Sequence, residues 1–360
     1  MDDDAPGIEP GTPYLAVDLD ILDRNLRGMA AGAADRGLAL RPHAKTHKCV
    51  PIAQRQLAYG AAGLTVATIG EAEVFAEAGC TDLFIAYPVW ASDARARRLR
   101  ALAERVTLRV GVDSPEAAAL LARALVGTGA EVLVEVDSGH HRSGVEPASA
   151  GTVAVAAARQ GLPVRGVFTF PGHGYGPGRR ADAAADEAGA LVAAAAALEA
   201  EGIDAEVRSG GSTPTADLTD GDVLTEFRPG VYVFGDAQQV ELGSCGWPDV
   251  ALTAVATVVS RSGPRVILDA GSKVLGADQP AWVTGAGRLP DHPEARITAL
   301  SEHHATVVFP ADRPTPGLGE QLRVAPNHVC SAVNLADELV IVSDGRVADR
   351  WAVAARGANT

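Results

Sequence analysis

The chain has 360 residues, of which 47% are hydrophobic and 21% are charged. This length and composition predict a soluble globular protein with two domains, or a barrel with an added domain. The formal net charge of -14 argues against a general nucleic-acid or anionic-membrane binder, although it does not exclude a local site for a small anion.

The N-terminal Met-Asp-Asp-Asp lacks the basic and apolar regions of a secretory signal. The longest apolar run, Leu191 to Leu198, is too short to span a membrane. Four cysteines are scattered without the spacing of a disulfide framework: Cys49, Cys80, Cys245 and Cys330. We therefore expect a cytoplasmic protein with reduced thiols.

From about Leu15 to Phe234, short apolar segments alternate with alanine-rich helical segments. The expected strands are 38–41, 64–67, 83–87, 108–112, 132–136, 164–170, 205–209 and 231–234. The expected helices are 21–35, 52–59, 70–77, 94–104, 115–125, 148–160 and 182–201. This alternation predicts an α/β fold with a parallel (β/α)8 TIM-type barrel. A doubly wound open sheet is the alternative, which the lack of a GxGxxG motif after the first strand disfavours.

After Asp236 the long helical patterns end, and short β-type segments are separated by Gly, Pro and Asp turns. The expected strands there are 250–260, 264–269, 296–300, 305–309, 321–324 and 338–342. We predict a barrel over residues 12–236 and a C-terminal all-β domain over residues 237–360. We expect residues 1–11 to pack on or near the β-domain.

The most informative segment is Arg41-Pro42-His43-Ala44-Lys45-Thr46-His47-Lys48. Every second residue from Arg41 to His47 is basic or a histidine, so an extended segment would place these side chains on one face. A lysine at a strand end is a candidate Schiff-base nucleophile, because burial and neighbouring cations lower its pKa. A solvated basic edge explains the spacing equally well.

Further polar clusters follow later strands, where barrel enzymes place their chemistry. The loop Ser209–Thr215 combines glycines with hydroxyl groups and suits a phosphate, although an ordinary turn is the alternative. Residues 137–144 offer Arg142, and residues 171–176 offer His173 and Tyr175; both segments are equally compatible with structural loops.

His328-Val329-Cys330 is the sharpest feature of the expected β-domain. Residues i and i+2 of an extended segment face the same side, so the imidazole and the thiolate could bind one ion such as Zn²⁺. Two protein ligands leave positions for water or substrate. On this motif alone, a packed histidine beside a buried thiol is the commoner explanation.

Taken together, these segments resemble the fold-type III pyridoxal-phosphate enzymes of the D-threonine aldolase and D-serine dehydratase branch. The match rests on residues 41–48, 137–144, 211–213, 228–230, 327–330 and 333–335, in this order along the whole chain. The resemblance implies an alanine-racemase-like barrel followed by a β-domain. It also implies a homodimer in which the partner subunit helps to form each active site.

The resemblance further implies cofactors and the residues that bind them. Lys45 would carry pyridoxal 5'-phosphate covalently, and His328 and Cys330 would hold a divalent metal, zinc or manganese. The other implied cofactor-binding residues are His43, Arg142 and Tyr175 near the ring, Gly211, Ser212 and Thr213 at the phosphate, and Gly230 and Tyr232 nearby.

The implied activity is that of a lyase acting on D-β-hydroxy-α-amino acids, in which Lys45, His328 and Cys330 are catalytic. We expect retro-aldol cleavage to glycine and an aldehyde. β-Elimination to a keto acid and ammonia is the alternative, because one site serves both reactions. D-threonine aldolases of this branch typically pair the metal histidine with an aspartate, so His328-x-Cys330 looks more like the dehydratase pattern.

Two other classes are weaker alternatives: a non-catalytic pyridoxal-phosphate-binding protein and a barrel hydrolase that uses metal alone. An alanine racemase is disfavoured, because such racemases take a catalytic tyrosine from the second domain and this chain has no tyrosine after Tyr232. We expect a small D-amino acid and a second copy of the chain as partners, and neither nucleic acid nor a membrane.

Overall fold

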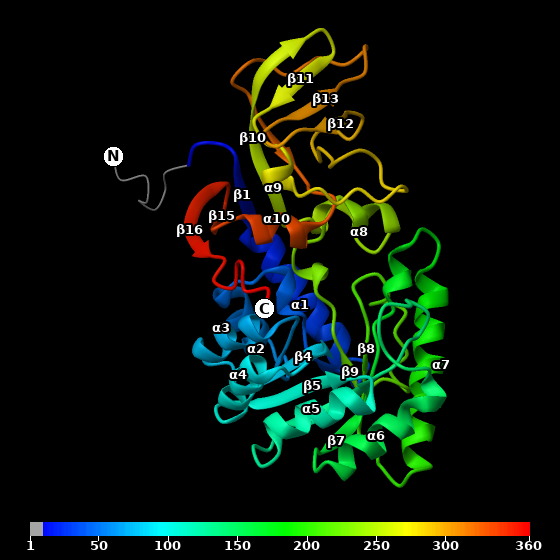
Figure 1. Cartoon of the computed structure of the whole chain (residues 1–360). Coiled ribbons are helices and arrows are strands. Elements are labelled where there is room, and N and C mark those ends of the chain that lie inside the picture. Colours follow the sequence, from blue (N-terminus) through cyan, green and yellow to red (C-terminus); the bar gives the residue numbers. More distant parts are fainter. Residues whose placement is uncertain (1–9) are drawn as a thin grey trace. The chain divides into compact units, whose positions relative to one another are not determined.

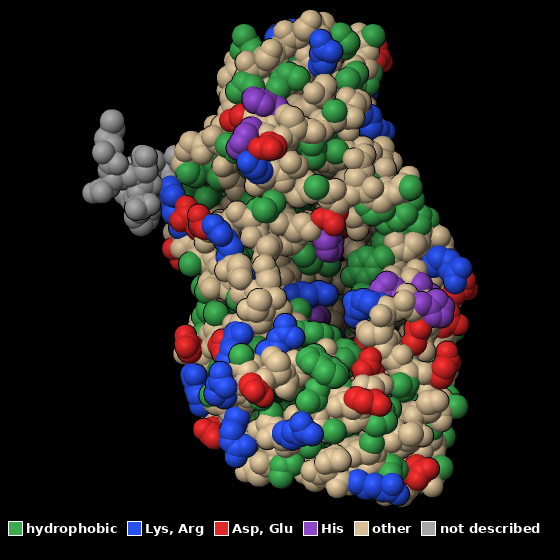
Figure 2. Space-filling model, in the orientation of Figure 1, with side chains coloured by type: hydrophobic (Ala, Val, Ile, Leu, Met, Phe, Trp, Pro, Cys, Tyr) green, Lys and Arg blue, Asp and Glu red, His purple; other side chains and the backbone are tan. Residues whose placement is uncertain are grey.

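The computed structural model describes residues 10–360, which form two compact units. The barrel unit contains Gly28–Lys45, Ile52–Gly230 and Ala358–Thr360, and the β-unit contains the residues up to Arg27, Thr46–Pro51 and Val231–Gly357. No helix among the described residues is both long and apolar enough to cross a bilayer. Figure 2 shows acidic and basic side chains mixed over the visible face rather than separated into patches.

The barrel unit is built on an eight-stranded sheet in the order β2-β9-β8-β7-β6-β5-β4-β3, and every paired neighbour runs parallel (Figure 1). Its edge strands β2 and β3 meet through a bridge between His43 and Thr65, so the sheet curls into a barrel. The strands are β2 (Ala39–Leu40), β3 (Leu64–Val66), β4 (Asp82–Pro88), β5 (Thr107–Val112), β6 (Glu131–Glu135), β7 (Val164–Phe168), β8 (Val207–Gly210) and β9 (Glu226–Phe227). The predicted fold class is confirmed.

The barrel strands are buried along most of their length, as near-continuous apolar runs predict for a parallel sheet covered by helices. The helices are α1 (Leu19–Ala34), α2 (Val50–Ala58), α3 (Ile69–Glu77), α4 (Asp93–Ala103), α5 (Pro115–Leu125), α6 (Ala150–Arg159) and α7 (Arg180–Glu199). Small residues bring them close together: a Cβ at Gly151 of α6 would lie 2.4 Å from the carbonyl oxygen of Ala197 in α7.

One predicted barrel strand is wrong. Residues 231–234 do not form a strand; Val231–Val233 form the 3₁₀-helix η4, and the strand that completes the sheet is β9. Val231 to Phe234 are all buried, so this run of apolar residues reflects their burial and does not indicate a strand. Periodicity alone does not separate a buried strand from a short buried helix.

The β-unit has its own eight-stranded sheet in the order β12-β13-β11-β10-β1-β15-β16, with β14 also paired to β10. The strands are β1 (Tyr14–Asp18), β10 (Leu252–Ser262), β11 (Arg265–Leu268), β12 (Arg296–Leu300), β13 (Ala305–Val308), β14 (Gln321–Val324), β15 (Glu338–Ser343) and β16 (Arg346–Ala352). Short helices α8 (Ala237–Leu242), α9 (Ser272–Leu275) and α10 (Val329–Leu335) interrupt it. The sequence pattern missed β1, β16 and these helices.

The two units do not follow one another along the chain as predicted, because each of them is made of several separate segments. We placed residues 12–236 in the barrel, but β1 pairs antiparallel with β10 and parallel with β15 and so belongs to the sheet of the β-unit. The chain passes from the barrel unit to the β-unit after Gly230, and residues 46–51 also belong to the β-unit. The prediction for residues 1–11 falls mostly on residues 1–9, which lie outside the described residues.

Near the amino ends of the barrel strands, buried charges pair with one another. Arg41 is 2% exposed, and its Nε lies 2.6 Å from Oε2 of Glu226 while its Nη1 lies 2.7 Å from Oδ1 of Asp82. Arg109 lies 2.9 Å from Glu131 and 3.6 Å from Glu226. Burial opposes ionisation of Glu226, but the charge of Arg41 outweighs it and lowers the pKa of this carboxyl. We call these five residues the amino-end network.

Candidate active site

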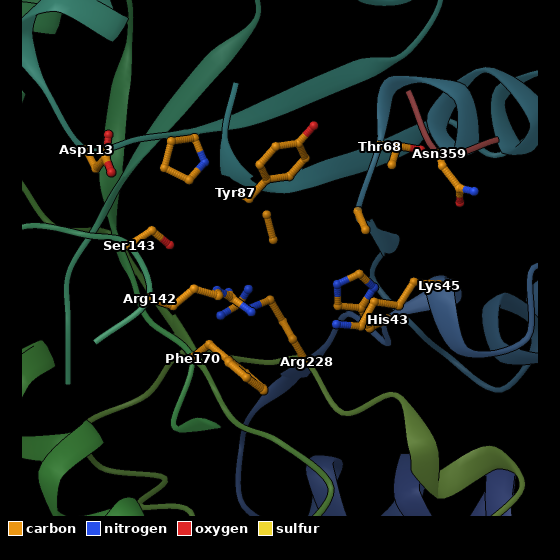
Figure 3. A pocket seen from close by; sticks show the side chains of 13 residues that line it. His43, Lys45, Thr68, Tyr87, Asp113, Arg142, Ser143, Phe170, Arg228 and Asn359 are labelled. Atoms are coloured by element: carbon orange, nitrogen blue, oxygen red, sulfur yellow. The ribbon is translucent and has the colours of Figure 1, made fainter. Parts of the chain in front are cut away.

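A cavity of about 580 Å³ opens at the carboxyl ends of the barrel strands (Figure 3). Twelve of its thirteen lining residues lie at the end of a barrel strand or in the loop that follows it. Those labelled in Figure 3 are His43, Lys45, Thr68, Tyr87, Asp113, Arg142, Ser143, Phe170 and Arg228, with Asn359 as the thirteenth, from outside the strands. The cavity therefore occupies the position where barrel enzymes carry their chemistry.

Lys45 and His43 line this cavity, but the segment is not extended as predicted. The chain turns into the 3₁₀-helix η1 (Ala44–Thr46) shortly after β2. Arg41 is directed into the amino-end network, and Nδ1 of the buried His47 accepts a hydrogen bond from the Cys49 amide at 3.1 Å. The expected single face of alternating side chains is therefore wrong, because η1 rotates the residues away from a period of two.

Two arginines contribute positive charge to the cavity. Arg142 packs on the ring of Phe170 with its guanidinium carbon 5.1 Å from the ring centroid, and Nζ of Lys45 lies 5.8 Å from the same centroid. Arg228 is 6% exposed, and its Nη2 donates to the carbonyl oxygen of Thr169. Burial lowers the pKa of Arg228, and among the described residues its buried Nε has no hydrogen-bond partner. A buried donor without a partner at a cavity wall suits an anionic or acceptor ligand.

A buried carboxyl group, that of Glu135, lies near Arg142. Glu135, at the end of β6, is 3% exposed and accepts a hydrogen bond from Oγ of Ser143 at 3.0 Å. Its Oε1 lies 3.9 Å from a guanidinium nitrogen of Arg142, and its Oε2 has no partner among the residues described. Burial raises the pKa of Glu135 to about 7, so this group can hold a proton near neutral pH.

The predicted phosphate loop follows β8. Gly211 has a φ of +85°, and a Cβ there would lie 2.0 Å from the ring of Phe227, so only glycine fits. Its N–H donates to Oε1 of the fully buried Glu187 at 2.6 Å, and the Ser212 N–H donates to Oγ1 of Thr215 at 3.1 Å. Burial raises the pKa of Glu187 to about 7. Both amides already have acceptors, which the sequence did not reveal.

The structure brings together only some of the predicted cofactor residues. His43, Lys45 and Arg142 line the cavity, whereas Gly211, Ser212, Thr213, Tyr175 and Gly230 of the barrel unit do not. Tyr175 ends the 3₁₀-helix η3 (Gly172–Tyr175), with its ring 6.1 Å from that of Phe170. Tyr232 is buried in η4 of the β-unit.

Several lining residues were missed: Tyr87, Asp113, Phe170, Asn359 and the side chain of Arg228. Tyr87 belongs to β4, and Asp113 directly follows β5. Their place at the carboxyl end of an expected strand was a usable signal, whereas nothing local in the sequence pointed to Asn359.

The predicted metal pair lies at the start of α10 in the β-unit. His328 is the N-cap residue and Cys330 lies in the first turn, so the expectation of one continuous extended segment is wrong. The pKa of His328 is raised well above its usual value, mainly by charge attraction to Cys330, and Asp236 contributes to the same shift. Nδ1 of His328 lies 3.4 Å from Oδ2 of Asp236, which also accepts from the Val329 amide at 3.1 Å.

The donor set fits a borderline divalent metal only in part. An imidazole nitrogen and a thiol sulfur are ligands of the type that Zn²⁺ prefers. No group of three or more His, Cys, Asp or Glu side chains in the described part of the chain is arranged to hold a metal. An ion at His328 and Cys330 would therefore need further ligands from water or substrate.

Comparison with known families identifies the family to which the chain belongs. Residues 17–238 match the alanine racemase N-terminal domain, and residues 251–342 match a serine dehydratase domain. The chain therefore belongs to the fold-type III family of pyridoxal-phosphate enzymes, in the branch that contains D-threonine aldolases and D-hydroxyaspartate dehydratases. This confirms the resemblance inferred from the sequence motifs.

Individual relatives match along nearly the whole chain. A D-threonine aldolase of Arthrobacter sp. is 36% identical over 98% of this chain and 96% of that protein. The crystal structure of D-threonine aldolase from Filomicrobium marinum has a TM-score of 0.89 at 34% identity and covers 98% of both chains. A cysteine-to-alanine mutant of D-threo-3-hydroxyaspartate dehydratase, in the metal-free form, has a TM-score of 0.87 at 31% identity and covers 95% of this chain and 97% of that one.

Proposed function

We propose that the protein is a pyridoxal-phosphate- and divalent-metal-dependent lyase that cleaves D-β-hydroxy-α-amino acids to glycine and an aldehyde. The observation that carries this proposal is the position of Lys45, whose side chain lines a cavity with Arg142 and Arg228 at the carboxyl end of the barrel. The match to D-threonine aldolase over 98% of the chain supports the reaction class.

The residues of the barrel unit fit the cofactor. Lys45 would hold it covalently, Arg142 and Phe170 would pack beside it, and the buried Nε of Arg228 would gain a partner. Gly211 to Thr213, with Gly230 nearby, would serve its phosphate, which would have to replace Glu187 and Thr215 as acceptors of the Gly211 and Ser212 amides. When bound, pyridoxal phosphate supplies an electron sink for a bond that breaks at the α-carbon of the substrate.

The chain itself supplies orientation and proton transfer. The amine of Lys45 lines the cavity and could accept or return a proton at the α-carbon of the substrate. Arg142 and Arg228 offset negative charge in the cavity. Glu135 can keep a proton near neutral pH, so it does not add a full negative charge next to Arg142.

His328 and Cys330 would hold the metal, and Asp236 would orient His328. A carboxylate near one ring nitrogen fixes an imidazole so that the other nitrogen faces a metal. A divalent metal would supply a Lewis acid for the β-hydroxyl of the substrate. A metal-free form has been solved for a cysteine-to-alanine mutant of the related dehydratase, which supports a role for Cys330.

Cys330 also favours a second candidate reaction, β-elimination to a keto acid and ammonia. A structure of the related D-threo-3-hydroxyaspartate dehydratase with a cysteine-to-alanine mutation is in the metal-free form. Both reactions begin with the same substrate class and differ in which bond breaks. The residues of the site are compatible with either outcome.

The decisive experiment is product analysis with D-threonine, D-serine and D-threo-3-hydroxyaspartate offered separately to the purified protein. Glycine with an aldehyde supports the aldolase, and a keto acid with ammonia supports the dehydratase. Activity should disappear with a chelator and return with Mn²⁺ or Zn²⁺. A protein that binds the cofactor at Lys45 but yields no product from any of the three would overturn the proposed reaction. A homodimer is also expected, and sedimentation analysis tests it.

A further inference from the structure

One residue that lines the cavity comes from neither the barrel strands nor their loops. Asn359 belongs to Ala358–Thr360, a segment that rejoins the barrel unit after the chain has passed through the β-unit. Its side chain lies beside Thr68, on the same side of the cavity as His43 and Lys45 (Figure 3). We call Ala358–Thr360 the tail segment.

Hydrogen bonds on both sides of Asn359 hold the tail segment in place. Oγ1 of Thr68 donates to the carbonyl oxygen of Ala358 at 2.5 Å. The amide of Gly70 donates to the main-chain oxygen of Thr360 at 2.9 Å, and Arg98 donates to the same oxygen at 3.1 Å. Because these bonds hold the backbone before and after it, Asn359 is kept at one place on the cavity wall.

The first turn of α3 is shaped to receive the tail segment. A Cβ at Gly70 would lie 3.0 Å from the main-chain oxygen of Thr360 and 3.2 Å from Cβ of Ala358, so glycine leaves the room that the segment needs. Arg98 is itself held by Glu73 through two hydrogen bonds of 2.8 and 2.7 Å. A bidentate ion pair of this kind fixes the guanidinium that contacts Thr360.

The chemistry of the wall suits a carboxylate. Lys45, Arg142 and Arg228 give the cavity positive charge, and Asp113 is the one carboxylate among the lining residues that the structure describes. Asn359 adds a side-chain amide, which is a hydrogen-bond donor that carries no charge. A donor on the same side of the cavity as the lysine is suited to the carboxylate of an amino-acid substrate.

We propose that Asn359 is a substrate-binding residue whose side-chain amide donates a hydrogen bond to the carboxylate of the amino-acid substrate, with the tail segment holding it in position. The inference rests on the proposed function, because Lys45 determines where the amino group and hence the α-carbon of the substrate must lie. It assigns part of substrate recognition to a segment far from the barrel strands in the sequence.

Two substitutions at this position test the proposal in the full-length enzyme. Asn359→Ala removes the donor and should raise the KM for the amino-acid substrate about tenfold, with kcat within about threefold. Asn359→Asp places a negative charge against the carboxylate and should raise KM about a hundredfold. The matched control is Thr360→Ala, because Gly70 and Arg98 both contact Thr360 through its main-chain oxygen; the KM of this variant should stay within about twofold.

A readout specific to the carboxylate separates binding from a structural role. For the amide of the same D-amino acid, which lacks the carboxylate, Asn359→Ala and the wild type should differ by less than about twofold. Arg98→Ala, which loosens the tail segment without touching the cavity, should raise KM a few fold for the acid. Melting temperatures and the visible band of bound cofactor should be unchanged in the Asn359 variants.

Unchanged KM values in both Asn359 variants would overturn the inference, and so would an equal rise in Thr360→Ala or an equal rise for acid and amide. Failure of the proposed function would look different: the wild type itself would lack the visible band or form no product. The two failures are therefore distinguished in one set of measurements.

Discussion

The carboxyl groups at the two ends of the barrel are paired with arginine to different extents. At the amino end, each carboxylate of the amino-end network, Asp82, Glu131 and Glu226, has an arginine nitrogen within 3 Å. At the carboxyl end, Oε2 of Glu135, Oε2 of Glu187 and Nε of Arg228 are buried and have no hydrogen-bond partner among the described residues. Paired charge is expected where a structure only has to be stable, and unpaired polar atoms are expected where a ligand binds.

The largest expected effect is a loss of activity at the carboxyl end without a loss of stability. Lys45→Ala should abolish the visible band of the bound cofactor and lower kcat by about a thousandfold or more, because the covalent attachment is lost. Absorbance after cofactor addition and a product assay measure this. Lys273→Ala is the control, since Lys273 pairs with Glu302 at an exposed site in the β-unit. If the visible band persists in Lys45→Ala, the assignment of covalent cofactor attachment to Lys45 is contradicted.

The next effect is a loss of stability at the amino end. Arg41→Met leaves Glu226 buried without its main partner, and we expect the free energy of unfolding to fall by about 3–5 kcal/mol. Urea unfolding followed by circular dichroism measures the change. Arg323→Ala breaks the exposed ion pair with Asp291 and should cost about 1 kcal/mol or less. Equal losses in the two variants would contradict the assigned role of the amino-end network.

A smaller effect concerns pH. The pKa of Glu187 is raised from 4.5 to about 7, so the folded protein binds this proton more tightly than the unfolded chain does. The associated stability is fully present below pH 4.5 and is lost as pH rises through 7. The difference of 2.5 pH units corresponds to about 3 kcal/mol at most.

Glu187→Gln should remove this dependence, because the amide oxygen still accepts from Gly211 but no longer ionises. Urea unfolding of the cofactor-free protein at pH 5 and pH 7.5 measures it, and the stability lost between these values should be smaller in the variant. Glu302→Gln, at an exposed side chain, should keep the wild-type difference. An unchanged difference in Glu187→Gln would mean that this carboxyl ionises as freely in the folded state as in the unfolded state.

The smallest effect concerns Phe170, which packs against Arg142 in the wall of the cavity. Phe170→Leu removes the ring on which Arg142 packs and should weaken cofactor binding by about threefold to tenfold, since one cation–π contact is lost. Titration with pyridoxal phosphate, followed by absorbance, gives the dissociation constant. Phe309→Leu, a buried ring of the β-unit, serves as the control for general loosening. An unaltered dissociation constant would show that the ring does not support the cofactor side of the cavity.

Most of the barrel could be predicted because its parallel strands are buried on both faces and so read as short apolar runs between helices. The prediction failed at residues 231–234, where burial without a strand gives the same pattern. β1 was missed because its partners, β10 and β15, lie more than two hundred residues later, and no local pattern records such a pairing.

Residues of the candidate site could be predicted where a reactive side chain stands within a recognisable sequence motif. His43, Lys45 and Arg142 stand in recognisable clusters and do line the cavity. Arg228 was noticed only as part of the motif at residues 228–230. Asn359 was not noticed, because its place depends on the tail segment binding to α3. The acceptors of the Gly211 and Ser212 amides depend on Glu187 and Thr215, which only the folded chain brings to them.

The pairing of β1 has a consequence for synthesis on the ribosome. Tyr14 is bonded in register opposite Val255, so 241 residues must be added after the strand emerges before its partner exists. At about 5–20 residues per second, this takes roughly 10–50 s. During that interval a short, apolar segment stays without its strand partners and with open hydrogen-bonding edges, while much of the barrel is already able to close. Slower translation would lengthen the exposure of this strand to aggregation.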